Sequence, residues 1–565
     1  MVMNQLRVKR ILACLEDFFA AASSICSCNG ASGSARLMHC DYPRSLQARW
    51  RPASIMSEVP SGLEVEMPEP RPVRPSSSLM LTRDGVEGVE VLLCRRVDEL
   101  PAFAGYWSFP GGGVSQVDIS SAETLLGGMT DRDLAANLIG MMRELVEELG
   151  WVIEDGSIGN ADSEARKNVL ASKGGWLAEV ESGRLPCDYA GLTTIGRRIT
   201  PNFAPIRFDN RFLHFHAGSG EDVPEPNLGG QTEFDSHRWA RPSQFLDEWR
   251  ENTIKIPPPI ITVLLELEEL LPKYRQEISL TVKELSARGE EKPILFAHGV
   301  ECIPVPTHTL PPASTTNTYL LGIGGDHIIV DAAARTAEGL AMISRAVERI
   351  KNSGGRVIGL LFTHRHLDHV GDIAELQKLG PFPVLASAET AEAIPCKVKT
   401  ILADGDIISL PGTDATQEWR VLITPGHCPG HICLINDSGL VAGDMVAGIG
   451  TILIPPEEGN MEQYLEQLVR LAEMQPHLIF PSHGVVLPLP EKTFNHYIEH
   501  RRKRHQLVLE AVISGTTELS EISQITYFDS PEAHPGLARQ QTLSHLLSHA
   551  RTGALEQRGD GWHTR

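Results

Sequence analysis

The chain has 565 residues, 42% of them hydrophobic, which is long enough for about three to four domains with buried cores. Its 51 lysines and arginines against 72 aspartates and glutamates give a net charge of −21, so we expect no overall attraction to nucleic acid or to an anionic membrane. No apolar stretch is long enough to span a bilayer, and the ten scattered cysteines include no C-x-x-C pair. These features favour a reduced, cytoplasmic compartment.

Residues 1–65 show no sustained hydrophobic periodicity, and we expect a disordered extension there. Basic residues between positions 7 and 10 precede an apolar run, which leaves an organellar, mitochondrial transit peptide as an alternative. Glu16 and Asp17 interrupt that run, which argues against a secretory signal. The first structured domain, with an insertion and a connector, is predicted over 66–290.

This first domain carries a glycine-rich loop and an acidic helix. Two strands are predicted between residues 78 and 94, and the loop 110–113 allows the backbone to approach a ligand closely. In a later predicted helix, Glu144, Glu147 and Glu148 are spaced i, i+3 and i+4 and share one face. Carboxylates so close repel one another unless a cation lies among them, and such oxygen ligands suit Mg²⁺ or Mn²⁺ beside a phosphate. A solvated acidic helix face is the alternative.

The sequence R-E-L-V-E-E-L-G-W at 143–151 resembles the second half of the signature of Nudix hydrolases. The first half departs from that signature. Ala135 stands where the family has a glutamate, and an insertion containing Asp118 separates Gly113 from the helix. The segment 200–209 is similar to the Nudix subgroup related to peroxisomal CoA diphosphatases.

The resemblance covers about residues 75–270 and implies an α/β/α sandwich. It implies that Glu144, Glu147 and Glu148 bind Mg²⁺ or Mn²⁺, with Glu147 and Glu148 acting in catalysis. The implied substrate is a CoA-type or nucleotide-type diphosphate. Because Ala135 replaces a family glutamate, a domain that only binds a nucleotide and regulates the rest of the chain is an alternative.

A helix is predicted over 260–271 and a charged connector over 273–292. From 293 to 490, predicted strands alternate with helices, as in an α/β layered domain. The apolar run 357–362 predicts a buried strand, and the sequence H-x-H-x-D-H at 364–369 follows it directly.

Three more polar residues each follow an apolar run, namely His427, Asp444 and His483. All can therefore converge on one rim of a sheet. Nitrogen and oxygen donors at this density suit zinc or another first-row divalent metal.

The order H-x-H-x-D-H, then His, Asp and His, resembles the metallo-β-lactamase superfamily across 293–490 and implies an αββα sandwich. By that resemblance, His364, His366 and His427 bind one metal ion, Asp368, His369 and His483 bind a second, and Asp444 bridges the two. The ions implied are two zinc, or manganese or iron. A hydroxide activated between them would attack the substrate, with Asp368 in the catalytic set.

Two neighbours of His427 have other expected roles. His431 could orient a ligand, face the substrate or serve only its own loop, whereas Cys428 is not expected to bind metal because the set is complete without it. No motif for a serine or cysteine nucleophile stands out.

The tail, 494–565, is predicted to hold helices at 494–514, 516–522 and 540–550 and a short strand at 553–556, which suggests a winged helix. A lactamase-type domain before a winged helix resembles the β-lactamase-like protein 2 family, whose members include single-strand-specific endoribonucleases. The basic cluster 501–505 could contact phosphates, or it could be a solvated or docking face.

The chain is therefore predicted to be a multidomain α/β and α+β metal-dependent hydrolase. In one reading it hydrolyses a thioester of the acyl-CoA or glyoxalase II-like acyl-glutathione type, and its first domain cleaves a CoA-like diphosphate. In the other it cuts single-stranded RNA, and its first domain handles nucleotide diphosphates. Partners are thus a small thioester or nucleotide diphosphate, or RNA, with no membrane.

Overall fold

The computed structural model describes residues 69–565 apart from 101–102, 230–232, 290 and 414. The extension expected at 1–65 lies outside the described residues. Among the helices that are described, none combines the length and apolar character needed to cross a bilayer.

The N-terminal α/β part is built on a seven-stranded sheet in which the first and eighth strands pair in parallel. Its strands are β1 (Arg74–Gly85), β2 (Gly88–Arg96), β3 (Trp107–Ser108), β4 (Gly111–Gly113), β7 (Thr193–Ile199), β8 (Phe208–Ser219) and β9 (Phe234–Ala240). A separate hairpin consists of β5 (Trp151–Glu154) and β6 (Ser157–Asn160). The helical elements are α2 (Gln116–Leu125), α3 (Arg132–Leu149), α4 (Ser163–Ala171), α5 (Gly175–Glu181), η3 (Gly220–Asp222), α6 (Pro242–Arg250), α7 (Pro258–Lys273) and α8 (Ile278–Ala287).

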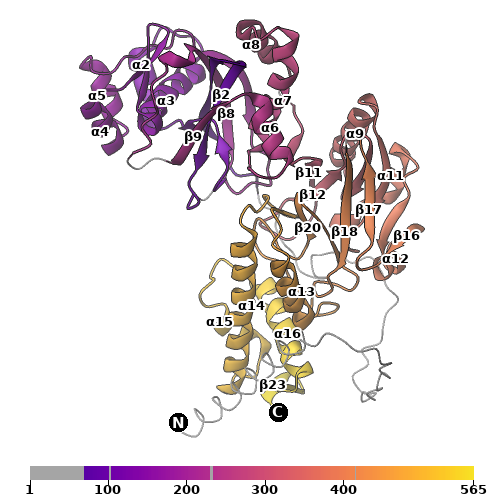
Figure 1. The fold of residues 1–565 in the computed structure, drawn as a ribbon. Helices are drawn as coiled ribbons and strands as arrows, with labels where there is room; N and C mark the ends of the chain where they lie inside the picture. The colour runs from indigo at the N-terminus through magenta and orange to yellow at the C-terminus, as the bar shows by residue number, and fades with distance from the viewer. Residues whose placement is uncertain (1–68, 101–102, 230–232, 290, 414) are drawn as a thin grey trace, which may run out of the picture. The chain divides into compact units, whose positions relative to one another are not determined.

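The side chains of β1 point alternately into two separate hydrophobic cores. Leu79 and Leu81 face the core that contains α3, whereas Met80 faces the core that contains α6 and α7. Successive side chains of a strand point to opposite faces, so helices cover both sides of the sheet (Figure 1). The α/β/α layering is as predicted.

The segment 273–292, predicted to be a charged connector, instead contains the helix α8. Ile278, Val282 and Leu285 lie on one face of it and pack into the core shared with α7. The charged residues between them concealed this apolar stripe in the sequence.

The second α/β part contains a seven-stranded and a five-stranded sheet. The first consists of β10 (Ile294–Ala297), β11 (Val300–Pro306), β12 (Thr315–Leu321), β13 (Asp326–Val330), β14 (Arg356–Leu361), β15 (Val384–Ser387) and β16 (Val398–Leu402). The second consists of β17 (Ile407–Pro411), β18 (Thr416–Ile423), β19 (Ile432–Asn436), β20 (Gly439–Gly443) and β21 (Ile479–Pro481). The helices are α9 (Ala337–Asn352), α10 (Leu367–Val370), α11 (Ile373–Leu379), α12 (Ala388–Ala393) and α13 (Met461–Glu473).

These sheets pack face to face, with Tyr319 and Leu361 of one meeting Trp419 and Phe480 of the other. Separate cores join the outer face of the first sheet to α9 and α11, and the outer face of the second to α13. The layers are therefore helix, sheet, sheet and helix, which is the αββα arrangement predicted from the sequence.

The tail contains three helices and a terminal hairpin, α14 (Pro490–Ile513), α15 (Leu519–Thr526), α16 (Pro535–Arg551), β22 (Leu555–Arg558) and β23 (Gly561–Thr564). These are the kinds of element expected there, and the winged-helix class stays a prediction. The basic cluster divides, because Arg501 and Arg504 are buried whereas Arg502 and Lys503 are exposed.

Candidate metal centre

The predicted ligands of the second α/β part all follow the ends of strands. His364 and His366 come after β14, and His427 comes after β18. Asp444 follows β20 directly, and His483 lies just after β21. Asp368 and His369 lie on the short helix α10, so one turn adds two more donors to the same place.

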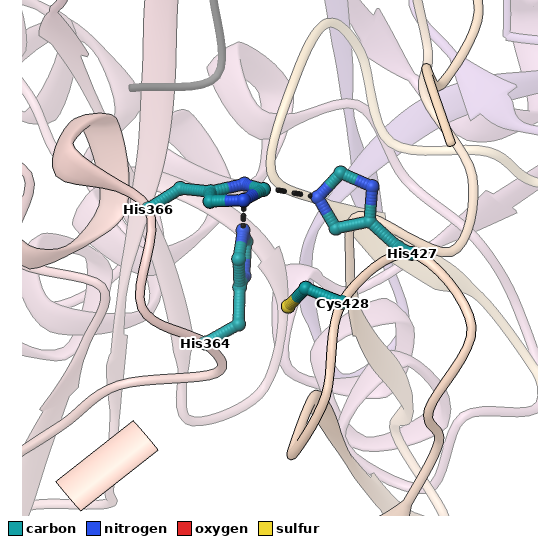
Figure 2. Close-up of side chains that lie close together, drawn as sticks. All are labelled: His364, His366, His427 and Cys428. Carbon is teal, nitrogen blue, oxygen red and sulfur yellow. Dashed lines mark hydrogen bonds between the residues drawn. The ribbon is translucent and has the colours of Figure 1, made fainter. Parts of the chain in front are cut away.

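Three histidines meet at one point. His366 Nδ1 lies 3.1 Å from His364 Nε2 and 3.1 Å from His427 Nε2, and Figure 2 shows the three rings turned toward one another. All three side chains are at most 1% exposed. Nitrogens this close, shielded from water, are suited to sharing a cation.

Hydrogen bonds on the side of each ring away from the cluster determine which ring nitrogen carries no hydrogen. His366 Nε2 lies 2.7 Å from the Glu458 carboxylate, and His427 Nδ1 lies 2.8 Å from the Leu453 carbonyl, so both outer nitrogens carry the hydrogen. The Thr363 hydroxyl donates to Asp331 and therefore accepts from His364 Nδ1. In their neutral forms the three rings thus direct lone pairs inward, which is how metal-binding histidines are oriented.

The second group of donors surrounds Asp444. Its Oδ1 lies 3.5 Å from His369 Nε2 and 3.6 Å from His483 Nε2, while its Oδ2 lies 3.7 Å from His427 Nε2. Asp368 Oδ2 lies 3.8 Å from His369 Nε2 and 3.7 Å from His483 Nε2. Asp444 thus stands between the two groups, as the bridging role predicted for it requires.

The charges of this cluster call for a cation. Burial alone would raise the pKa of Asp444, but the adjacent His369 and His483 rings hold it well below its usual value. Burial would lower the pKa of His369, yet Asp444 and Asp368 raise it well above the usual range. Both carboxylate oxygens of Asp444 and Nε2 of His369 are buried without a hydrogen-bond partner. A divalent metal ion fits this donor set, since it satisfies these atoms and neutralises the aspartates.

His431 and Cys428 have different relations to the cluster. His431 Nδ1 lies 2.8 Å from the Thr424 hydroxyl, and its Nε2 accepts a hydrogen bond of 3.0 Å from the backbone N–H of Asp444. It therefore holds the backbone of the predicted ligand Asp444, which fits one of the three roles left open by the sequence. The Cys428 sulfur lies within 4.8 Å of the donor nitrogens of the three histidines (Figure 2). Burial raises the pKa of that thiol well above its usual value.

Two acidic residues of the site were missed in the sequence. Asp331 accepts from Thr363 and lies 2.9 Å from His369 Nδ1, and Glu458 joins His366 to Arg365. Asp331 comes directly after β13, so the pattern that identified the ligands could have found it. Glu458 lies in a loop and carries no such signal.

The predicted glutamates of the N-terminal part lie on α3 beside the β4 loop. Glu148 accepts a hydrogen bond of 2.8 Å from the backbone N–H of Gly111, and burial raises its pKa well above the usual value. Burial also raises the pKa of Glu144 to about 7. Among the described residues, these glutamates do not bring three donor atoms within 4.8 Å of one another, as the histidine cluster does.

Arg143 explains that difference. Its guanidinium is completely buried and pairs with Glu144 at 2.9 Å, with Glu147 at 2.8 Å and with Asp118 at 2.7 Å. Asp118 comes from α2, inside the insertion, whereas Ala135 packs in the core. The insertion thus supplies Arg143 with a carboxylate that Ala135 cannot provide. Oxygen donors and a glycine-rich loop fit Mg²⁺ or Mn²⁺ in kind, although a metal ion must compete with Arg143 for two of the three glutamates.

Comparisons with known proteins agree with this geometry. Residues 311–483 match the model of the metallo-β-lactamase superfamily. The chain contains a metallo-β-lactamase domain. It is 27% identical over 255 residues to a β-lactamase-like protein 2 homologue of Drosophila melanogaster, covering 42% of this chain and 84% of the fly protein.

Two further likenesses are partial. The chain is 27% identical over 200 residues to an atrochrysone carboxyl ACP thioesterase of Aspergillus fumigatus, covering 35% of this chain and 59% of that protein. A NUDIX hydrolase from Alicyclobacillus acidocaldarius is 28% identical with a TM-score of 0.31, covering 35% of this chain and 91% of its own. This TM-score is too low to carry an argument about the N-terminal part, so the Nudix resemblance stays a prediction.

Proposed function

We propose that the metallo-β-lactamase domain hydrolyses a thioester of the acyl-CoA or acyl-glutathione type at a dinuclear metal site. The observation that carries this proposal is the buried convergence of five histidines and two aspartates, with the rings oriented by outer partners. Two zinc, manganese or iron ions bound there would supply a water molecule ionised near neutral pH and a positive charge for the developing oxyanion.

The chain's own residues then have distinct tasks. His364, His366 and His427 would hold one ion, Asp368, His369 and His483 would hold the other, and Asp444 would contact both. No side-chain nucleophile is needed, because the bound ions would activate a water molecule. The fungal relative named as a thioesterase favours a thioester. The net charge of −21 gives the chain no overall attraction to RNA.

For the N-terminal part we propose a Mg²⁺-dependent or Mn²⁺-dependent diphosphatase acting on a CoA-type or nucleotide-type diphosphate. It is supported by the buried Glu144 and Glu148 beside the glycines of β4. Asp118 restores the carboxylate missing at Ala135, which weakens the main reason for regarding this part as a binding module alone. Together, the two activities of one chain would cleave both the thioester bond and the diphosphate of an acyl-CoA.

Endoribonuclease activity is the second candidate for the metallo-β-lactamase domain. It is favoured by the β-lactamase-like protein 2 homologue, since the match covers 84% of that protein. It is opposed by the tail, where Arg501 and Arg504 are buried and Lys503 pairs with Asp529 at 3.1 Å.

The experiment offers zinc-loaded or manganese-loaded full-length protein an acyl-glutathione, an acyl-CoA and a labelled single-stranded RNA in parallel. Thioester hydrolysis that disappears in His427→Ala supports the proposal. RNA cleavage without thioester hydrolysis would replace it with the second candidate.

A further inference from the structure

The tail contacts the loop that orients the predicted ligands. This loop, 444–460, joins β20 to α13 and will be called the β20–α13 loop. It begins with Asp444, and the Leu453 carbonyl in its middle accepts from His427. Near its end, Glu458 accepts from His366. Three of the predicted ligands therefore depend on the path of one loop.

Helices of the tail bind that loop from its other side. On α14, Arg501 donates to the Thr451 hydroxyl at 3.1 Å and to the Ile452 carbonyl. On α16, Gln541 Oε1 accepts from the backbone N–H of Ile454 at 3.1 Å, and the Ser544 hydroxyl donates to the Ile454 carbonyl. All three tail side chains are at most 5% exposed, so water does not compete readily for these bonds.

One peptide unit connects the tail to His427. The Leu453 carbonyl and the Ile454 N–H belong to the same peptide bond, which is planar, and they point in opposite directions. His427 Nδ1 binds one edge of this plane at 2.8 Å, and Gln541 binds the other at 3.1 Å. A rotation of the plane that broke the bond to Gln541 would also turn the carbonyl away from His427.

We propose that the tail acts as a clamp that positions the metal site, with Gln541 as the main positioning residue and Arg501 and Ser544 in support. The clamp fixes the Leu453 carbonyl and thereby the ring orientation and tautomer of His427. Arg501 belongs to the basic cluster for which the sequence left phosphate contact, a solvated face and a docking face as alternatives. Its hydrogen bonds to the β20–α13 loop fit the docking alternative and make it part of the clamp. This inference rests on the proposed metal site.

The test compares three variants of α16 in full-length protein loaded with Co²⁺, whose visible absorption reports the ligands and geometry around it. Gln541→Leu keeps the size of the side chain but removes the acceptor for Ile454. Gln541→Glu keeps an acceptor oxygen. Arg539→Ala changes an exposed residue on the same helix and is the matched control.

Gln541→Leu should alter the Co²⁺ spectrum and weaken metal binding about 10-fold to 100-fold, the effect typical of losing a partner behind a ligand. Gln541→Glu should largely restore both, and Arg539→Ala should match the wild type. An unchanged spectrum and affinity in Gln541→Leu would overturn the clamp, as would an equal change in Arg539→Ala. A wild-type protein that binds no Co²⁺ would instead overturn the proposed metal site itself.

Discussion

The metallo-β-lactamase domain collects its donors from the ends of four strands, whereas the glutamates of the N-terminal part follow one another on the single helix α3. The first site leaves the carboxylate oxygens of Asp444 without a hydrogen-bond partner, but the second already contains the cation Arg143. The difference shows that spacing along the sequence predicts which donors gather. The partners behind those donors determine whether they are free to bind a metal ion.

The largest effect is expected from Asp444→Asn. This change removes the negative charge between the two groups of histidines, so thioester hydrolysis should fall by roughly a hundredfold to a thousandfold, the scale of a lost electrostatic contribution. Steady-state kinetics with an acyl-CoA measures it. The exposed Asp437→Asn is the control, and equal activity in the two variants would remove Asp444 from the site.

Next comes Glu147→Gln, which probes whether the N-terminal part is a separate catalyst. Diphosphatase activity with Mg²⁺ should be lost while thioester hydrolysis is unchanged, because this glutamate lies on α3, outside the metallo-β-lactamase domain. Release of phosphorylated product from a CoA-type diphosphate measures it, with the exposed Glu154→Gln as the control. If Glu147→Gln keeps full diphosphatase activity, α3 does not carry that reaction.

Asp118→Ala should weaken the N-terminal part itself. Removing one partner of a buried charge leaves Arg143 undercompensated, and the free energy of unfolding should fall by about 3 kcal/mol. Chemical denaturation measures the loss, and Glu123→Ala on the exposed face of α2 should have little effect. A stability equal to wild type would show that Glu144 and Glu147 alone suffice for Arg143.

A smaller effect is expected on how the free energy of unfolding of the tail depends on pH. His505 and His545 approach at 3.2 Å between α14 and α16, and the ring of His549 stacks on His505. Burial lowers the pKa of all three. The unfolded chain therefore binds more protons below the ordinary histidine pKa of about 6.5, so the free energy of unfolding should decrease as the pH falls through 6.5.

Thermal unfolding between pH 7.5 and pH 5 measures this dependence. It should be shallower in His545→Gln than in the control His308→Gln, which changes an exposed histidine. Identical slopes in the two variants would contradict the assignment of the titration to the tail.

Much of this arrangement was predictable because strand ends are visible in the sequence. His427, Asp444 and His483 each end an apolar run, and the strands that position them lie where predicted. Glu458 was not predictable, because its contact with His366 depends on the course of a loop.

The basic cluster of the tail shows a different limit. The sequence left phosphate contact, a solvated face and a docking face as alternatives for this cluster. Arg501 and Arg504 share a buried face of α14 with Tyr497 and Val508. The helical spacing of these arginines with apolar neighbours was the available signal. Their partners, the Ile452 and Thr526 carbonyls, are backbone groups that no sequence pattern marks.

The most direct test of the central claim is the zinc content of the full-length protein, measured by elemental analysis after dialysis with excess Mg²⁺ to occupy the glutamates. The five buried histidines and the two aspartates predict about two zinc ions per chain, and His366→Ala should lower that number. One zinc ion or none in the wild type would contradict the dinuclear site.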